Sequence, residues 1–262
     1  MPHLLNVWPN VSRRLRGADQ VLLLFDYDGT LTPIVPEPGA AELPPAAARG
    51  LAELAGGTRF LVGVVTGRSL ADIQQRVGIP GLIYAGNHGL EIQGAGLDFV
   101  HEAAARFAPE LAPITAKLEE AMAGLTGVFV EPKGLTLTVH FRMTPDPLST
   151  RVEEAFASTL APYLETGSVK VTTGKKVLEV RPNVDWGKGQ AISMLRDAFP
   201  RASETMFFGD DVTDEDGFKV VQDSGGIAVF VGPARQPTVA WHRLDDPAEV
   251  GDFLGLLSNL DG

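Results

Sequence analysis

The stretch Val21-Leu22-Leu23-Leu24-Phe25-Asp26-Tyr27-Asp28-Gly29-Thr30 decides the fold. An uninterrupted apolar run stops at Asp26, and a second carboxylate follows two positions later. A short run that is apolar on both faces is typical of a parallel strand covered by helices on both sides. We therefore expect a strand of an α/β sheet that presents Asp26 and Asp28 at its carboxyl end.

The same pattern occurs twice more. Residues 60–65 form an apolar run that stops at Thr66, and residues 206–208 run into Gly209 and Asp210. Ligands of open α/β sheets bind beyond the carboxyl ends of the strands, so three such ends predict one site. Each residue taken alone has an alternative interpretation as an ordinary loop residue, because Asp and Thr are common in turns.

The middle of the chain differs from both ends and predicts a small inserted α+β domain. Its expected elements are a helical stretch at 102–125 that Pro109 and Pro113 break or kink, a half-buried antiparallel strand at 135–142, a helix from about Leu148 to near Pro162, and a hairpin of 168–173 and 176–180 around Gly174. The expected domains are therefore a core made of residues 1–102 and 185–262 and a cap at 103–184.

The composition excludes several classes of function. The formal net charge of −11 over 262 residues argues against nucleic acid or an anionic membrane as a partner. The absence of cysteine excludes disulfides, thiolate metal sites and cysteine nucleophiles. We see no signal peptide and no run of about 20 apolar residues that could span a membrane. We expect a cytoplasmic monomer that acts on a small molecule.

The acidic residues at the strand ends predict a magnesium site. Two carboxylates beyond a buried strand repel each other unless a cation or a proton intervenes. Mg²⁺ prefers carboxylate oxygens and shares its coordination shell with substrate phosphate, and a carboxylate can itself attack phosphorus. The acidic run 209–216 follows a strand and precedes a helix, with Thr213 and Asp216 in capping-box spacing. We interpret this run as part of the metal site rather than as a solvated face.

Two further segments suit phosphate binding. Thr66, in Val65-Thr66-Gly67-Arg68, offers a hydroxyl next to backbone N–H groups, whereas Arg68 is interpreted as a salt bridge at a helix start. Lys188 lies between Gly187 and Gly189, which allow an anion to approach closely. The alternative for Lys188 is a solvated surface lysine.

Taken in chain order, the segments at 25–30, 65–68, 185–189 and 209–216 resemble the four motifs of the haloacid dehalogenase superfamily. More narrowly, the chain resembles the trehalose-6-phosphate phosphatases of that superfamily over nearly its full length. Besides the doubled acid at 210–211, the resemblance rests on the segments Gly86-Asn87-His88-Gly89-Leu90-Glu91, Val130-Glu131-Pro132-Lys133-Gly134, His140-Phe141-Arg142 and Lys176-Val177-Leu178-Glu179-Val180-Arg181-Pro182. It implies a Rossmann-like parallel-sheet core with an inserted α+β cap of the C2B type.

The resemblance also implies roles for individual residues in a hydrolysis of trehalose 6-phosphate through an aspartyl-phosphate. Asp26 is then the nucleophile, and Asp28 is the general acid and later the base. Asp26, the backbone carbonyl of Asp28, and Asp210 hold Mg²⁺, with Asp211 or Asp214 behind them. Thr66 and Lys188 bind the transferring phosphoryl group. The substrate-binding residues implied in this way are Glu131, Lys133, Glu179, His88 and Arg142.

Alternatives remain for the cap residues and for the substrate. Glu131, Lys133 and Glu179 could be ordinary surface charges, and a lone histidine such as His88 is often structural. The substrate could be another sugar phosphate, such as sucrose 6-phosphate or a glycosyl-glycerate phosphate. A response-regulator receiver domain also combines acids with Thr and Lys, but it is about half as long and has no inserted cap.

Overall fold

The structure, a computed structural model, describes residues 1–174 and 176–260. Contacts divide the chain into two compact units. The core consists of Met1–Phe99 and Trp186–Gly262, and the cap consists of Val100–Asp185. The limits expected from the sequence, 103 and 184, lie within a few residues of these. None of the helices in the described ranges has the length and apolar character needed to cross a membrane.

The core contains an eight-stranded sheet in the order β12-β11-β10-β1-β2-β3-β4-β5. The strands from β12 to β3 are parallel, and β4 is antiparallel to β3. The strands are β1 (Gln20–Phe25), β2 (Phe60–Val65), β3 (Ile83–Gly86), β4 (Glu91–Gly94), β5 (Leu97–Val100), β10 (Ala202–Gly209), β11 (Ile227–Val231) and β12 (His242–Leu244).

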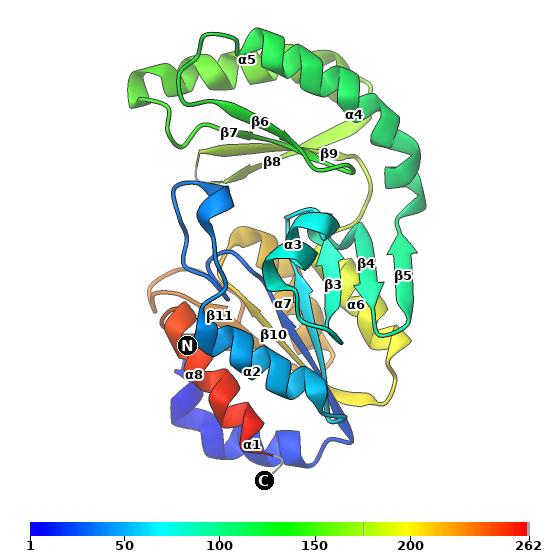
Figure 1. The fold of residues 1–262 in the computed structure, drawn as a ribbon, viewed down its shortest axis with the longest axis vertical. Helices are drawn as coiled ribbons and strands as arrows, with labels where there is room; N and C mark the ends of the chain where they lie inside the picture. The colour runs from blue at the N-terminus through cyan, green and yellow to red at the C-terminus, as the bar shows by residue number, and fades with distance from the viewer. Residues whose placement is uncertain (175, 261–262) are drawn as a thin grey trace. The chain divides into compact units, whose positions relative to one another are not determined.

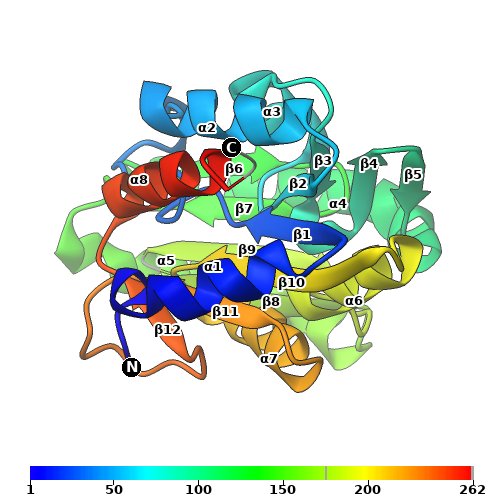
Figure 2. The same cartoon turned by 90° about the horizontal axis from the view of Figure 1, so that it is seen from below.

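Helices cover both faces of the core sheet, as the apolar runs predicted, and Figure 2 shows α2, α3 and α8 on the side opposite α6 and α7. The α-helices are α1 (Trp8–Arg16), α2 (Pro45–Gly56), α3 (Leu70–Val77), α6 (Lys188–Ala198), α7 (Glu215–Asp223) and α8 (Pro247–Ser258). Short 3₁₀ helices are η1 (Leu4–Val7), η2 (Pro38–Ala40), η3 (Asn87–Gly89) and η4 (Val212–Asp214).

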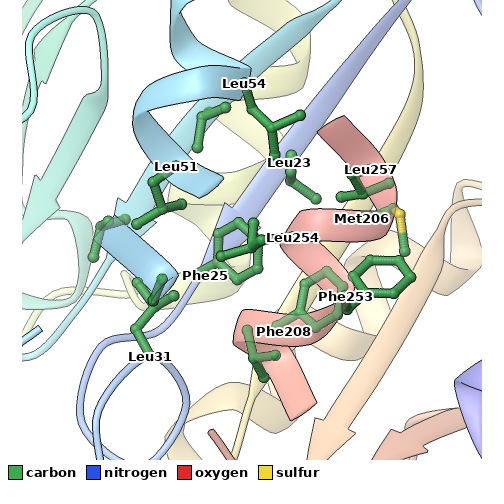
Figure 3. Packing of buried hydrophobic residues seen from close by; sticks show 14 of the residues in the cluster. Leu23, Phe25, Leu31, Leu51, Leu54, Met206, Phe208, Phe253, Leu254 and Leu257 are labelled. Carbon is green, nitrogen blue, oxygen red and sulfur yellow. The ribbon is translucent and has the colours of Figure 1, made fainter. Parts of the chain in front are cut away.

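The side chains of β1 alternate between two apolar layers. Leu23 and Phe25 are fully buried on the side of α2 and α8, where Phe25 stacks on Phe208 with ring centroids 4.8 Å apart (Figure 3). Leu22 and Leu24 are fully buried on the side of α6 and α7. Because both faces are buried, the strand is fixed in register, and the position of Asp26 at its end is fixed with it.

The cap contains a four-stranded antiparallel sheet in the order β6-β7-β9-β8, and α4 and α5 lie on one of its faces (Figure 1). Its elements are α4 (Glu102–Ala121), β6 (Phe129–Pro132), β7 (Leu137–His140), α5 (Asp146–Glu165), β8 (Val169–Gly174) and β9 (Val177–Pro182). Apolar side chains of the sheet, including Val130, Val139 and Val180, pack with both helices in one cluster. The expected hairpin around Gly174 is confirmed, although residue 175 lies outside the described residues.

The cap elements differ from the expectations in several places. The helix α4 is not broken at Pro109 or Pro113, because Leu111, Ile114 and Leu118 anchor it on the sheet. The helix α5 ends at Glu165, close to the expected end near Pro162. The strand expected at 135–142 is shorter, and β6 was not expected at all.

The chain passes between the units next to a stacked pair of rings in the core. Phe99 is the last core residue before the cap, and Trp186 is the first one after it. Their rings stack with centroids 5.4 Å apart, and the indole Nε1–H of Trp186 donates to the carbonyl oxygen of Gly89 at 2.8 Å. Both chain crossings are thus anchored to the same place in the core.

Candidate active site

The parallel pairing of β10, β1 and β2 brings the three predicted strand ends to one edge of the core sheet. The three strands are neighbours, with β1 in the middle. The backbone N–H of Asp26 continues the ladder by donating to the carbonyl oxygen of Phe208 at 2.8 Å, and Thr66 N–H donates to Ala85 at 2.9 Å. Asp26 and Thr66 are both buried, and Asp210 follows the neighbouring strand β10.

Lys188 links the acids of this edge. It begins α6 and is 1% exposed. Its ammonium donates to Asp26 Oδ1 at 2.6 Å and to Asp214 Oδ1 at 2.7 Å. A lysine so deeply buried requires such partners, because an unpaired buried ammonium is strongly disfavoured. Lys188 is therefore not a solvated surface lysine.

The protonation of the site indicates a shortage of positive charge. Burial raises the pKa of Asp26 to about 7, although the attraction of Lys188 opposes the change. Burial, with the negative charges of Asp26 and Asp214, raises the pKa of Asp210 to about 9. Burial alone would lower the pKa of Lys188, but attraction to Asp214 and Asp26 is stronger and raises it. One ammonium therefore does not compensate three carboxylates.

The donor atoms fit a hard divalent cation. Asp26, Asp210 and Asp214 offer carboxylate oxygens that all lie within 4.8 Å of one another. Asp210 Oδ1 is buried and has no hydrogen-bond partner among residues 1–174 and 176–260. Gly29 has a φ of 91°, and a Cβ at this position would collide with the Asp210 carboxylate. An orphaned buried oxygen beside other carboxylates is the donor set that Mg²⁺ prefers.

Asp214 orients the site from behind. Its Oδ2 accepts from the backbone N–H groups of Asp210 and Asp211, at 3.1 Å each, while its Oδ1 accepts from Lys188. It is fully buried. Because its oxygens already accept these bonds, Asp26 and Asp210 remain the better metal ligands.

Two other predicted metal residues have different partners. Asp211 is exposed, and its Oδ1 accepts from Val212 N–H at 2.6 Å at the start of η4. Asp211 and Asp214 form the capping box here, so the expected pairing of Thr213 with Asp216 was wrong. The expectation failed because η4 precedes α7 and moves the cap by two residues. The Asp28 carboxylate is bound by Arg68.

Arg68 is more than the helix-start salt bridge that the sequence indicated. Its Nη1 does pair with Asp72 in α3 at 2.8 Å, and its guanidinium lies over the ring of Tyr27, 5.3 Å from the centroid. In addition, Nε and Nη2 each donate to one oxygen of Asp28 at 2.7 Å. Its position directly after Thr66-Gly67 was the only signal for this role.

Thr66 and His88 form the neighbouring wall of the core site. Thr66 Oγ1 accepts from the backbone N–H of Arg68 at 3.3 Å. His88 has a positive φ of 58°, and its backbone N–H donates to the carbonyl oxygen of Thr66 at 2.8 Å. A Cβ at Gly67 would collide with the imidazole of His88. His88 therefore packs against the loop that carries Thr66.

In the cap, the predicted residues Glu131, Lys133 and Glu179 lie on the polar face, meaning the sheet face opposite α4 and α5. Glu179 Oε1 accepts from Thr136 at 3.4 Å, and Oε2 accepts from Thr172 at 3.0 Å. Lys133 Nζ lies 3.9 Å from Glu179 and 4.0 Å from Glu131. The sequence predicted the three charged residues but missed the threonines, because their contacts cross between strands.

Two more cap residues, His140 and Arg142, lie at the end of β7 and just after it. His140 Nε2 lies 2.7 Å from Glu131 Oε2 and was not predicted as a site residue, although it belongs to the His140-Phe141-Arg142 segment. Arg142 is partly buried and follows the end of β7. Arg142 therefore lies on the cap, whereas His88 lies on the core.

Comparison with known proteins agrees with this arrangement. The model of the trehalose-phosphatase family matches residues 24–248. A trehalose-phosphate phosphatase of Mycobacterium tuberculosis (strain H37Rv) is 38% identical over 248 residues, which cover 92% of this chain and 62% of the relative. This chain therefore spans less than two thirds of that relative's length.

Solved structures share the fold. The C-terminal domain of the C. albicans trehalose-6-phosphate phosphatase is 26% identical, with a TM-score of 0.85 and coverage of 98% of each chain. A haloacid dehalogenase-like hydrolase from Bacteroides thetaiotaomicron is 16% identical with a TM-score of 0.65, covering 91% of this chain and 99% of that one. The predicted fold class, a haloacid dehalogenase-like core with an inserted α+β cap, is confirmed.

Proposed function

The chain belongs to the trehalose-phosphatase family, and on that premise we propose that it is a Mg²⁺-dependent phosphatase that hydrolyses trehalose 6-phosphate to trehalose and phosphate. The observation that carries the proposal is the position of Lys188 between Asp26 and Asp214. A buried nucleophile, its counter-ion and a metal-binding carboxylate then occupy one sheet edge. These are the parts that phosphoryl transfer to a carboxylate needs.

In the proposed first step, a carboxylate oxygen of Asp26 attacks phosphorus. The bond between Asp26 and phosphorus forms while the bond between phosphorus and the sugar oxygen breaks, which yields an aspartyl-phosphate. Lys188 already fixes Asp26 Oδ1, so the carboxylate is oriented before the substrate arrives. Lys188 and the Thr66 hydroxyl bind the transferring phosphoryl group.

Asp26, Asp210 and the backbone carbonyl of Asp28 would hold the metal. When bound, Mg²⁺ supplies positive charge to the phosphoryl oxygens and to the acids around them. Asp214 keeps Lys188 and the 210–211 backbone in place through hydrogen bonds of 2.7 Å and 3.1 Å. The exposed Asp211 contributes by starting η4 rather than by binding the ion.

Asp28 is the proposed acid and base. It gives a proton to the departing sugar oxygen and then takes one from the water that attacks phosphorus. In this second step the bond between Asp26 and phosphorus breaks, which releases phosphate and restores the Asp26 carboxylate. Arg68 binds both of its oxygens in this structure, so Asp28 exchanges at least one of these bonds to reach the substrate. The Asp28 side chain is 42% exposed and the Arg68 side chain only 9%, which makes Asp28 the movable partner.

The cap residues Glu131, Lys133 and Glu179 are proposed to bind the sugar hydroxyls, with Arg142 from the cap and His88 from the core as further substrate-binding residues. Carboxylate and ammonium groups within 4.0 Å of one another offer the acceptors and donors that a polyhydroxyl ligand requires. The hydroxyl groups of Thr136 and Thr172 hold the Glu179 carboxylate in one orientation.

A phosphate-release screen tests the proposed function. The purified chain is incubated with Mg²⁺ and with trehalose 6-phosphate, sucrose 6-phosphate, a glycosyl-glycerate phosphate or glucose 6-phosphate. We expect the highest kcat/KM on trehalose 6-phosphate. A higher value on another sugar phosphate would reassign the substrate, and release from none of them would contradict a sugar-phosphate phosphatase. The cytoplasmic location and the monomeric state stay predictions.

A further inference from the structure

The polar face of the cap sheet carries its side chains in rows across the strands. One row is acidic and hydroxyl-bearing, because Glu131 pairs with Thr138, Thr138 with Glu179, and Glu179 with Thr172. The next row is largely apolar, because Phe129 pairs with His140 and His140 with Val177. A band of acceptors therefore lies directly beside a band with an aromatic ring.

Phe129 is exposed in this second row. The preceding strand pattern places Val130 in the apolar cluster under the helices, so Phe129 points to the polar face. Phe129 is 57% exposed. Its ring stacks on His140, with centroids 5.7 Å apart and an angle of 22° between the planes. The ring is thus held from one side while more than half of its residue surface remains open.

His140 connects the two rows. Besides stacking on Phe129, its Nε2 lies 2.7 Å from Glu131 Oε2. The aromatic ring and the carboxylate are therefore fixed relative to each other through one imidazole. A pyranose has hydroxyl groups around its edge and C–H groups on its faces. Hydrogen-bonding groups can therefore bind its edge while an aromatic ring packs against one of its faces.

We propose that Phe129 is a further substrate-binding residue that packs against the C–H face of a sugar ring, with His140 as the residue that positions it. This inference rests on the proposed function, since it assumes that a sugar binds to the polar face. It adds an apolar contact to the charged residues that the sequence indicated. It also explains why a phenylalanine lies open in a row next to carboxylates.

The test compares Phe129→Ala, Phe129→Tyr and Leu164→Ala. Leu164 is the matched control, because it is an exposed apolar residue of the cap, 44% exposed, and lies on α5. We expect Phe129→Ala to raise KM for trehalose 6-phosphate about tenfold, since truncating an aromatic contact costs affinity. Phe129→Tyr keeps the ring and should retain nearly the wild-type KM, and Leu164→Ala should match the wild type. Melting temperatures verify that the variants fold.

Three outcomes would overturn the inference: an unchanged KM in Phe129→Ala, an equal loss in Phe129→Tyr, or an equal loss in Leu164→Ala. A second measurement does not depend on turnover. Saturation-transfer NMR with trehalose should give weaker ring-proton signals with Phe129→Ala than with the wild type. If the wild type prefers another sugar phosphate, the proposed substrate fails, and the same variants on that substrate and its sugar still decide the role of Phe129.

Discussion

Arg68 binds Asp28 through two parallel hydrogen bonds, from Nε and Nη2, each 2.7 Å long. The guanidinium is itself held by Asp72 and by the ring of Tyr27, so it forms a rigid fork. This fork sets the resting orientation of the carboxylate to which we assign proton transfer. Arg68 is therefore a positioning residue for Asp28.

The first prediction tests that relationship. Arg68→Lys retains a positive charge but loses the fork, so kcat for trehalose 6-phosphate should fall about tenfold or more. Arg76→Lys is the matched control, because Arg76 Nε also pairs with Asp72, at 2.7 Å, without contacting Asp28. Steady-state kinetics of both variants provide the measurement. Equal losses in the two variants would mean that the Asp72 network, and not the Asp28 fork, matters.

The second prediction concerns the nucleophile. Asp26→Asn should lower phosphate release by on the order of 10³ or more, because an amide cannot form the covalent intermediate. Asp211→Asn is the control, since Asp211 is an exposed acid at the start of η4. Single-turnover assays of phosphate release provide the measurement. An unchanged melting transition of each variant shows that it folds like the wild type. Turnover of Asp26→Asn within about tenfold of the wild type would reject the assignment.

The third prediction concerns the metal. A chelator should abolish activity, and Mg²⁺ should restore it, because the clustered acids repel a phosphate dianion in the absence of a cation. Mg²⁺ should also raise the melting temperature of the wild type, since a ligand that binds only the folded state stabilises it. Asp210→Asn should lose most of this increase. Full activity after exhaustive chelation would contradict the metal site.

The fourth prediction concerns the pH dependence of stability without metal. In the unfolded chain Asp210 gives up its proton near pH 4, whereas in the folded chain its pKa is raised to about 9. Between these values the folded state binds more protons, so stability falls as the pH rises. The melting temperature, measured in chelator at pH 5, 7 and 9, should therefore decrease less steeply with pH for Asp210→Asn than for the wild type.

Around neutral pH, the same substitution should raise the melting temperature of the metal-free protein. A change of 1 kcal/mol in the free energy of unfolding shifts the melting temperature by about 2–4 °C for a chain of this size, so the difference between the variant and the wild type is measurable. If the melting temperatures of the variant and the wild type change with pH in parallel, Asp210 is not the source of the pH-dependent loss of stability.

The fifth prediction concerns substrate selection. Glu179→Ala should lower kcat/KM for trehalose 6-phosphate about tenfold or more, because a hydrogen bond to a charged group is lost. It should act much less on p-nitrophenyl phosphate, which has no sugar hydroxyls. Glu165→Ala, at the end of α5, is the control. Equal losses on both substrates would indicate that Glu179 supports the fold, and no loss on either would leave it a surface charge.

The centre of the core could be predicted from sequence because its strands β1 and β2 are buried on both faces. The run 21–25 before Asp26 is apolar at every position, and the neighbouring strands β2 and β10 end in the apolar runs 60–65 and 206–208, so their ends were visible without coordinates. The partners across the sheet were not visible. The contact of Arg68 with Asp28 bridges 40 positions, and that of Lys188 with Asp26 bridges 162.

The cap was harder to predict because its sheet is apolar on one face only. In β6, Pro132 and the following Lys133-Gly134 indicated a turn and hid the strand. In α4, the prolines indicated a break that the apolar contacts of Leu111 and Ile114 outweigh. In both cases tertiary packing outweighs local secondary-structure propensity, and the packing partners cannot be recognised from the local sequence.

The stacked rings of Phe99 and Trp186 bear on how a cap domain can be inserted into such a core during evolution. They keep the two points at which the core chain is interrupted side by side, with ring centroids 5.4 Å apart. An interruption at this point closes a loop whose ends the core already holds together, so the inserted length adds little conformational entropy cost to folding of the core. This place in the core is therefore an insertion site at which one inserted domain can replace another. Substrate selectivity, which we assign to the cap, can then evolve separately from the catalytic residues of the core.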